Sequence, residues 1–196
     1  MNEMETHLRA RLAEILMDDK IIHEALRKAY DLDLPDWWIT SGAIYQTVWN
    51  TLSGKSSGHG IKDIDLIYFD ESDLGYDAED EVIRKVNRAF SGFGFPVEAR
   101  NQARVHLWFE ARFGVSYPRL KSASESLTYY AARTHAVAIH LAEGDHLDIV
   151  APFGLKAIFD MQLVPNPILD NGRTYAEKAA RMKRHWPELT IIPWGG

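Results

Sequence analysis

The sequence predicts one compact α/β domain with helical elaborations at both ends. The chain has 196 residues, about one domain at the usual ~100–200 residues per domain, and 46% of them are hydrophobic, which is enough to bury a large core. Segments with strand and helix patterns alternate along the chain, and no internal repeat or clear linker separates them. We therefore expect residues 1–196 to form a single domain.

Cysteine content and charge exclude several classes of site. The chain contains no cysteine, which rules out a disulfide framework, a thiolate zinc site and a cysteine nucleophile. Its formal net charge is −6, so the overall balance gives no support to non-specific binding of nucleic acid, which depends on Lys and Arg neutralising phosphates. A local basic patch is still compatible with this charge.

No segment predicts insertion into a membrane. The longest apolar stretches, such as 136–142, are far shorter than the ~20 residues that a membrane-spanning helix needs. The acidic start, residues 1–5, lacks the basic and then apolar pattern of a signal peptide. We expect a cytoplasmic protein without a membrane partner.

Residues 1–31 predict a helical N-terminal extension. Apolar side chains recur through residues 4–30 at close to helical spacing, with charged side chains between them, which is typical of one or two amphipathic helices. A turn at 31–35, which contains a proline, ends the extension.

A strand, a glycine turn and a helix are expected next. Residues 36–40 are typical of a short buried strand, Ser41 and Gly42 of a sharp turn, and residues 43–52 of a helix. The loop that follows, residues 53–60, contains three glycines and three serines, so its composition predicts flexibility.

Residues 63–70 combine β-forming residues with an opening alternation of acidic and apolar side chains, which predicts a strand. Because side chains two residues apart on a strand point to the same face, Asp63 and Asp65 are expected to share one face. The remaining expected elements are a helix over 80–90, a strand over 93–99, a helix over 123–133 with the capping-box pair Ser122 and Glu125, a hairpin of 136–141 with 146–150, and closing helices over 153–161 and 174–186.

Asp63 and Asp65 carry the sharpest chemical signal in the sequence. Two adjacent carboxylates can bind one hard cation, and Mg²⁺ usually takes one or two protein carboxylates plus substrate phosphates. An exposed strand face with two solvated acids has the same pattern, so Asp-x-Asp alone is a weak signal. The context favours a metal site, because the pair follows a strand–turn–helix unit whose helix N-terminus offers free amides and a positive dipole to a triphosphate.

With these motifs the chain resembles the DNA polymerase β-like nucleotidyltransferase superfamily, whose pattern is a Gly-Gly or Gly-Ser turn before a helix and then acid-apolar-acid on the next strand. Within the superfamily it is similar to an uncharacterised bacterial family of nucleotidyltransferases. The resemblance spans roughly residues 37–166, and its segments are SGAI (41–44) with VWN (48–50), DIDL (63–66) with YFD (68–70), RNQARVHLW (100–108) and APFGL (151–155).

The resemblance implies a polymerase β-like nucleotidyltransferase fold, with a mixed sheet flanked by helices. It also implies transfer of a nucleoside monophosphate from a nucleoside triphosphate to an acceptor hydroxyl, with release of pyrophosphate. Two Mg²⁺ or Mn²⁺ ions would bridge the carboxylates and the triphosphate, one activating the acceptor hydroxyl and one stabilising the pyrophosphate. The identity of the acceptor, a small molecule, a protein or an RNA, stays open.

A third carboxylate is expected on a neighbouring strand, and two residues fit its apolar-acid-apolar pattern. Glu98 is favoured, because it comes next after the paired acids and leads into the polar stretch 100–106. Asp148 is the alternative. The resemblance thus implies Asp63, Asp65 and Glu98 as catalytic metal ligands, with Glu98 also activating the acceptor hydroxyl.

The expected nucleotide-binding residues are Ser41, Gly42, Arg100 and Arg104. Guanidinium groups suit bidentate contacts to phosphate, although the two arginines fit equally well as partners of surface acids. Asn101 fits a second role as the cap of a helix that begins directly after it.

Two departures from the superfamily pattern bear on activity. Ala43 stands where the turn usually has serine, so Ser41 or Thr40 would have to supply a phosphate-binding hydroxyl. The separation between Gly42 and Asp63 is long because of the loop 53–60, which is either a lid over the nucleotide or, as we favour, a passive insertion.

The leading interpretation is a metal-dependent nucleotidyltransferase. The alternative is a catalytically inactive nucleotide-binding regulatory or interaction module of the same fold, suggested by Ala43. A glycosyltransferase that binds a nucleotide-sugar through Asp-x-Asp is disfavoured, because its nucleotide-binding sheet normally needs a longer chain. We expect the tryptophans to pack in the core rather than to stack on bases; these are Trp37, Trp38, Trp49 and Trp108.

Overall fold

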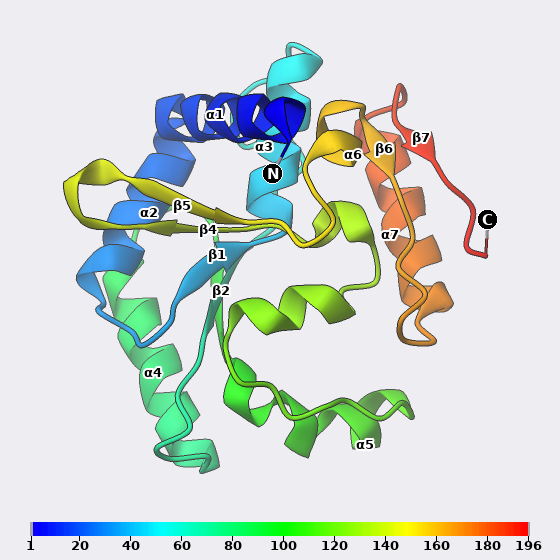
Figure 1. Ribbon diagram of the computed structural model, residues 1–196. Helices are drawn as coiled ribbons and strands as arrows, with labels where there is room; N and C mark the ends of the chain where they lie inside the picture. Colours follow the sequence, from blue (N-terminus) through cyan, green and yellow to red (C-terminus); the bar gives the residue numbers. More distant parts are fainter. Residues whose placement is uncertain (1, 196) are drawn as a thin grey trace.

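The computed structural model describes residues 2–195 and has a five-stranded mixed sheet at its centre (Figure 1). The strands have the order β3-β2-β1-β4-β5; β2 and β3 are parallel, and all other neighbours are antiparallel. The strand bounds are β1 Trp38–Thr40, β2 Ile64–Tyr68, β3 Val97–Asn101, β4 Ala138–Leu141 and β5 Leu147–Val150.

Helices flank this sheet, which confirms the fold class predicted from the sequence. Their bounds are α1 Glu3–Asp18, α2 Lys20–Asp31, α3 Gly42–Leu52, α4 Tyr76–Ala89, α5 Phe109–Phe113, α6 Lys156–Phe159 and α7 Gly172–His185. A second, two-stranded sheet is formed by β6 Gln162–Leu163 and β7 Thr190–Ile191. In the described part of the chain, no helix is both long and apolar enough to cross a membrane.

Two helices, α1 and α2, lie where the periodicity of residues 4–30 predicts them. Asp19 separates the two, because its carboxylate accepts hydrogen bonds from the backbone N–H groups of Ile21 and Ile22 and so caps α2. α1 packs against α3, and α2 packs against β4. The N-terminal helices therefore support the elements that form the candidate site.

α3 lies in the centre of the core. Its side chains Ala43, Ile44, Val48 and Trp49 are completely buried. Trp49 packs edge-on against Trp186, with ring centroids 5.3 Å apart, and donates its indole N–H to the carbonyl oxygen of Ile158 at 2.9 Å. Burying such a side chain stabilises the fold by ~1.5–3 kcal/mol. These contacts hold α3 in place, so its N-terminus keeps a fixed position at the end of β1.

The composition of loop 53–60 predicts flexibility, but its last part, residues 58–60, is packed against other elements, whereas Gly54, Ser56 and Ser57 are exposed. A Cβ atom on Gly60 would lie 2.4 Å from the Trp186 ring, and one on Gly58 would lie 2.9 Å from the Phe95 ring. The side-chain amide of Asn50 also donates to the carbonyl oxygen of His59 at 3.0 Å. The glycines therefore allow close packing and positive φ angles.

The helix predicted over 123–133 is wrong. Only a 3-10 turn, Ser124–Tyr129, forms there. The Ser122 hydroxyl does accept from the Glu125 N–H at 3.3 Å, but the Glu125 carboxylate accepts from the Lys121 N–H at 2.7 Å instead of completing a capping box. Tertiary bonds end the turn, because the side-chain amide of Asn166 donates to two backbone carbonyls at its end, those of Thr128 and Tyr130.

Candidate active site

The first part of the site is the turn between β1 and α3. Ser41 has a φ of 58°, a backbone conformation that is uncommon for a residue with a side chain. Its carbonyl oxygen accepts from the amides of Ile44 and Tyr45, while its side chain makes no capping hydrogen bond within residues 2–195. The hydroxyl and the first amides of α3 are therefore available to an anion, which the helix dipole also favours.

Gly42, the first residue of α3, packs closely against the next turn of the helix. A Cβ atom at this position would lie 2.9 Å from Nε2 of Gln46. Gln46 is only 2% exposed, so its side chain has little room to move. A residue larger than glycine would disturb the start of α3.

The acidic residues come together through the register of β2 and β3. Asp65 lies within β2, and Asp63 directly precedes the strand. In the parallel pair Asp65 is opposite Glu98, and in the antiparallel pair on its other side it is opposite Thr40. Adjacent strands are ~4.8 Å apart, so the backbone places the Glu98 carboxylate beside Asp65.

Electrostatics show how closely the acids interact. Burial and then the charge of Asp63 raise the pKa of Asp65 to about 6, and Glu98 contributes in the same direction. Lys178 on α7 opposes this shift. Burial lowers the pKa of Lys178, and Asp65 raises it. The site thus combines a carboxyl group that is hard to ionise, that of Asp65, with an amine that is hard to protonate, that of Lys178. Such shifted pKa values are typical of functional sites.

Asp148, the alternative third acid, lies elsewhere. The predicted hairpin of β4 and β5 forms, and within it Asp148 is opposite His140. Its carboxylate lies 3.6 Å from His140 Nδ1 and 3.5 Å from His146 Nε2. Because β1 and β4 separate β5 from β2, the sheet brings Glu98, and not Asp148, next to Asp65.

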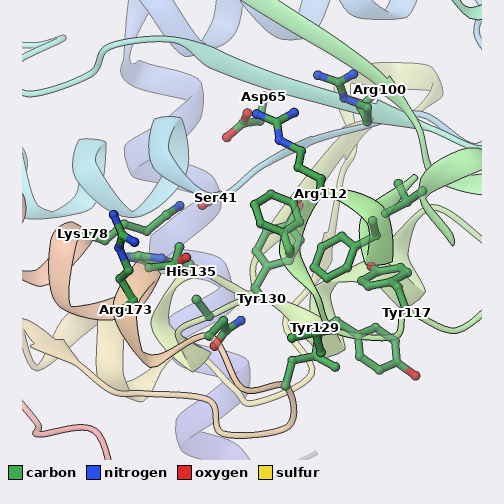
Figure 2. Close-up of a pocket in the computed structure, with 18 of the residues that line it drawn as sticks. Ser41, Asp65, Arg100, Arg112, Tyr117, Tyr129, Tyr130, His135, Arg173 and Lys178 are labelled. Atoms are coloured by element: carbon green, nitrogen blue, oxygen red, sulfur yellow. The ribbon is translucent and has the colours of Figure 1, made fainter. Parts of the chain in front are cut away.

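Two connected cavities meet at Asp65. The small cavity has a volume of about 360 Å³ and includes Gly42, Asp63 and Arg181, whereas the large cavity has a volume of about 860 Å³ and includes Glu98. Figure 2 shows Ser41, His135, Arg173 and Lys178 on one side of the large cavity and Arg100, Arg112, Tyr117 and Tyr129 on the other. The residues common to both cavities are Ser41, Asp65, Thr174, Glu177 and Lys178.

Sequence reasoning missed the contribution of α7. Lys178 and Arg181 lie on a helix face that lines the small cavity, while Tyr175 and Met182 face the core. A polar stripe at helical spacing was readable from the sequence, but a solvated helix face has the same pattern. Only the fold places these cations, more than 100 residues later in the chain, against Asp65.

The two predicted nucleotide-binding arginines have different positions. Arg100, on β3, lines the large cavity. Arg104 is 8% exposed and forms a buried ion pair with Glu79, and its Nε donates to the carbonyl oxygen of Leu74 at 2.8 Å. The structure therefore does not bring Arg104 to either cavity, and its guanidinium instead fixes α4 against β3. Asn101 has the capping role, since its Oδ1 accepts from the Ala103 N–H at 3.0 Å.

His135 is a further residue that the sequence did not single out. It lines the large cavity, is 1% exposed and stacks on Tyr45, with ring centroids 4.6 Å apart. Burial lowers its pKa, with Lys178 and Arg181 acting in the same direction, so the ring is neutral at physiological pH. Its Nε2 atom is buried and has no hydrogen-bond partner within residues 2–195.

The positions of the tryptophans and of the loop 53–60 bear on two further expectations. Trp37 and Trp49 are buried in the core as expected, and Trp38 packs against it, but Trp108 lines the large cavity.

The loop 53–60 follows the C-terminal end of α3, about 16 Å along the helix from Ser41, and none of its residues lines either cavity. This position favours the passive insertion over the lid.

The carboxylates fit the donor chemistry of Mg²⁺ or Mn²⁺. Within residues 2–195 no three acidic or histidine side chains are placed to hold a metal ion by themselves. Magnesium needs only one or two protein carboxylates when phosphates supply further oxygen ligands. Asp63 and Asp65 form such a donor pair, and the charge of Asp63 contributes to the raised pKa of Asp65.

Asp65→Asn is expected to raise the thermal midpoint in metal-free buffer at pH 8 and to have little effect at pH 4. The folded-state pKa of about 6 lies above the ordinary value of 3.8, so stability present below pH ~4 is lost as the pH rises through ~6. The amide removes this cost of ionisation. Thermal unfolding of both proteins across this pH range provides the measurement, and a difference independent of pH would contradict the assignment.

Comparison with solved structures finds proteins of similar fold. A structure determined by NMR and described as revealing a CCA-adding enzyme head domain is similar, with a TM-score of 0.76 and 25% identity over 93% of this chain and 95% of that chain. A structure described as a tRNA-processing enzyme in an apo form has a TM-score of 0.45 and 16% identity over 85% of this chain and 44% of that chain. No curated protein matches the chain.

A family model described as Nucleotidyltransferase matches residues 27–191. The match includes the β1–α3 turn, the aspartate pair, Glu98 and all of α7. The similarity to the structure described as a CCA-adding enzyme head domain extends over nearly all of both chains. The resemblance drawn from the sequence motifs is therefore confirmed, and the chain belongs to the nucleotidyltransferase family of enzymes.

Proposed function

We propose that the protein binds a nucleoside triphosphate with Mg²⁺ or Mn²⁺ and transfers its nucleoside monophosphate to an acceptor hydroxyl, releasing pyrophosphate. One observation carries the proposal: the β2–β3 register sets Glu98 beside Asp65, at the point where a cavity over the N-terminus of α3 meets a larger one. This arrangement provides separate places for a triphosphate and an acceptor. The similarity to a CCA-adding enzyme head domain supports the same class of reaction.

The triphosphate occupies the small cavity. Its anionic oxygens accept hydrogen bonds from the first amides of α3 and from the Ser41 hydroxyl, which replaces the hydroxyl that Ala43 lacks. Thr40 does not serve, because its hydroxyl is completely buried and bonded to the Tyr130 hydroxyl at 3.2 Å. Lys178 and Arg181 line the same cavity and neutralise charge that the leaving pyrophosphate develops.

Asp63 and Asp65 are the residues that would hold the metal ions, with Glu98 as the third acid. A bound divalent cation supplies Lewis-acid polarisation of the phosphate and lowers the pKa of the acceptor hydroxyl. Glu98 faces the large cavity and accepts the proton of the acceptor hydroxyl. The acceptor oxygen then forms a bond to the α-phosphorus, and the bond from that phosphorus to the bridging oxygen of pyrophosphate breaks. Arg100 offers its charge beside this reaction centre.

A nucleotide-binding module without catalysis is the second candidate, and Ala43 in place of serine is the observation that favours it. Two measurements on the same preparation separate the candidates. Calorimetry with each nucleoside triphosphate and Mg²⁺ reports binding, and a pyrophosphate assay in the presence of cell extract reports turnover. We expect both signals. Binding without pyrophosphate release from any triphosphate would support the inactive module instead.

A further inference from the structure

Five aromatic rings form one wall of the large cavity. This aromatic wall consists of Trp108, Phe109, Phe113, Tyr117 and Tyr129. The rings contact one another in series, with centroid separations of 6.1 Å for Trp108–Phe109, 4.7 Å for Phe109–Phe113, 4.6 Å for Phe109–Tyr117 and 5.2 Å for Tyr117–Tyr129. Figure 2 shows Tyr117 and Tyr129 on the side of the cavity opposite Lys178.

The aromatic wall does not belong to the hydrophobic core. None of its five rings is among the residues of the two buried clusters, and α5 contributes no buried residue. Phe113 is 50% exposed. The other four rings are half-buried, so the aromatic wall keeps part of its surface accessible from the cavity. Accessible aromatic faces that line a cavity suit a ligand with flat, apolar faces.

Two arginines add positive charge to the same wall. The guanidinium carbons of Arg100 and Arg112 lie 5.8 Å and 5.9 Å from the centre of the Trp108 ring, and Arg112 also lies 5.3 Å from that of Phe113. Within residues 2–195 neither guanidinium is in direct ion-pair contact with a carboxylate, unlike that of Arg104. A ligand that satisfies both the rings and the guanidiniums carries aromatic bases and phosphates, which is the chemistry of a nucleotide chain.

The position of the wall identifies this ligand as the acceptor rather than the incoming triphosphate. Glu98 lines only the large cavity, whereas Gly42 and Arg181 line only the small one. Arg100, at one end of the wall, is two residues beyond Glu98 on β3. One incoming base covers one or two rings, whereas a series of five rings matches several successive bases of an unpaired strand.

We propose that the aromatic wall is the acceptor subsite and binds the 3′-terminal nucleotides of a single-stranded nucleic acid. The inference rests on the proposed function. In the reaction, the terminal 3′-hydroxyl oxygen forms a bond to the α-phosphorus, its proton passes to Glu98, and pyrophosphate leaves as the bond to its bridging oxygen breaks. The strand becomes longer by one nucleotide.

The test is fluorescence anisotropy of 5′-labelled eight-nucleotide RNA and DNA strands without any triphosphate. Because Phe113 is half exposed, Phe113→Ala leaves the fold intact, and we expect it to weaken binding about 5- to 150-fold. Arg112→Gln is expected to lower the slope of log K against log salt by about 0.7. The RNA and DNA arms identify which kind of strand is bound.

A matched control pair exists elsewhere on the surface. Arg133 lies 5.5 Å from the ring of Phe153, which is 39% exposed, and neither residue lines a cavity near the acids. Phe153→Ala and Arg133→Gln are expected to leave strand binding unchanged. An equal loss in these controls would show non-specific attraction and overturn the proposal.

Two further outcomes would overturn it while leaving the proposed function standing. The first is normal binding of Mg²⁺ and triphosphate by a wild-type protein that binds neither strand. The second is a Phe113→Ala protein that loses triphosphate affinity but keeps its affinity for the strand, which would assign the wall to the incoming base. Absence of both triphosphate binding and strand binding would reject the two proposals together.

Discussion

Replacing both Asp63 and Asp65 by asparagine is expected to abolish metal-dependent binding of triphosphate and to lower kcat/KM by about 10³-fold or more. The amides keep the shape of the side chains but remove the two charges that hold a divalent cation. The loss falls on the transition state, where charge on the phosphate oxygens is greatest, so saturating triphosphate does not restore the rate. Calorimetry with and without Mg²⁺, together with pyrophosphate release, measures both effects.

A double replacement on the β4–β5 hairpin, Asp145→Asn with Asp148→Asn, is the matched control. It also removes two charges, and asparagine tolerates the positive φ of 61° at Asp145. Both residues lie outside the two cavities, so triphosphate binding and turnover should stay at the wild-type level.

The double variant of Asp63 and Asp65 should be at least as stable as wild type in metal-free buffer near neutral pH, because it lacks the repulsion between the two carboxylates. Undiminished triphosphate binding in the double variant of Asp63 and Asp65 would contradict the assignment of these residues as metal ligands.

Glu98→Gln is expected to lower kcat by ~10²–10⁴-fold with little change in the KM for triphosphate. The carboxylate acts on the acceptor hydroxyl in the chemical step, and it does not line the cavity assigned to the triphosphate. A glutamine in the same place keeps the volume and cannot accept the proton. Steady-state kinetics with varied triphosphate separate the two parameters.

Asp148→Asn serves as the control for this prediction, because Asp148 fits the same sequence pattern but pairs with His140 across β4 and β5. Its kcat should equal that of the wild type. A large loss in kcat for Asp148→Asn with a small one for Glu98→Gln would reverse the assignment of the third acid. A loss that appears only in the KM of Glu98→Gln would instead assign this carboxylate to substrate binding.

Local sequence patterns predict the elements that carry the site. Alternation and glycine placement are sufficient for β1, the turn at Ser41 and Gly42, α3 and β2 with its two acids, because each depends on a few adjacent residues. The order of the residues along the chain favours Glu98 over Asp148, but it does not establish which of them is the neighbour of Asp65. Strand order and register decide which acid is adjacent to Asp65, and these are properties of the whole sheet.

The features that the sequence did not predict depend on distant partners. Arg104 lies in a polar stretch of sequence that suits phosphate binding. Its guanidinium instead forms a buried ion pair with Glu79, 25 residues earlier in the chain. Lys178 reaches the site only because α7 packs back across the cavities. The loop 53–60 has the composition of a flexible segment, but its last part packs against Trp186 from the end of the chain. Contacts between residues so far apart in the chain cannot be predicted from composition or local pattern alone.

The central claim is that the metal ion and triphosphate bind between the α3 N-terminus and the β2–β3 acids. Paramagnetic broadening of backbone amide signals by Mn²⁺, in the presence of a non-hydrolysable triphosphate analogue, locates the cation directly. The account predicts selective broadening at Ser41, Gly42, Asp63, Asp65 and Glu98. Broadening centred on the hairpin residues 140–148, or spread evenly over the surface, would contradict it.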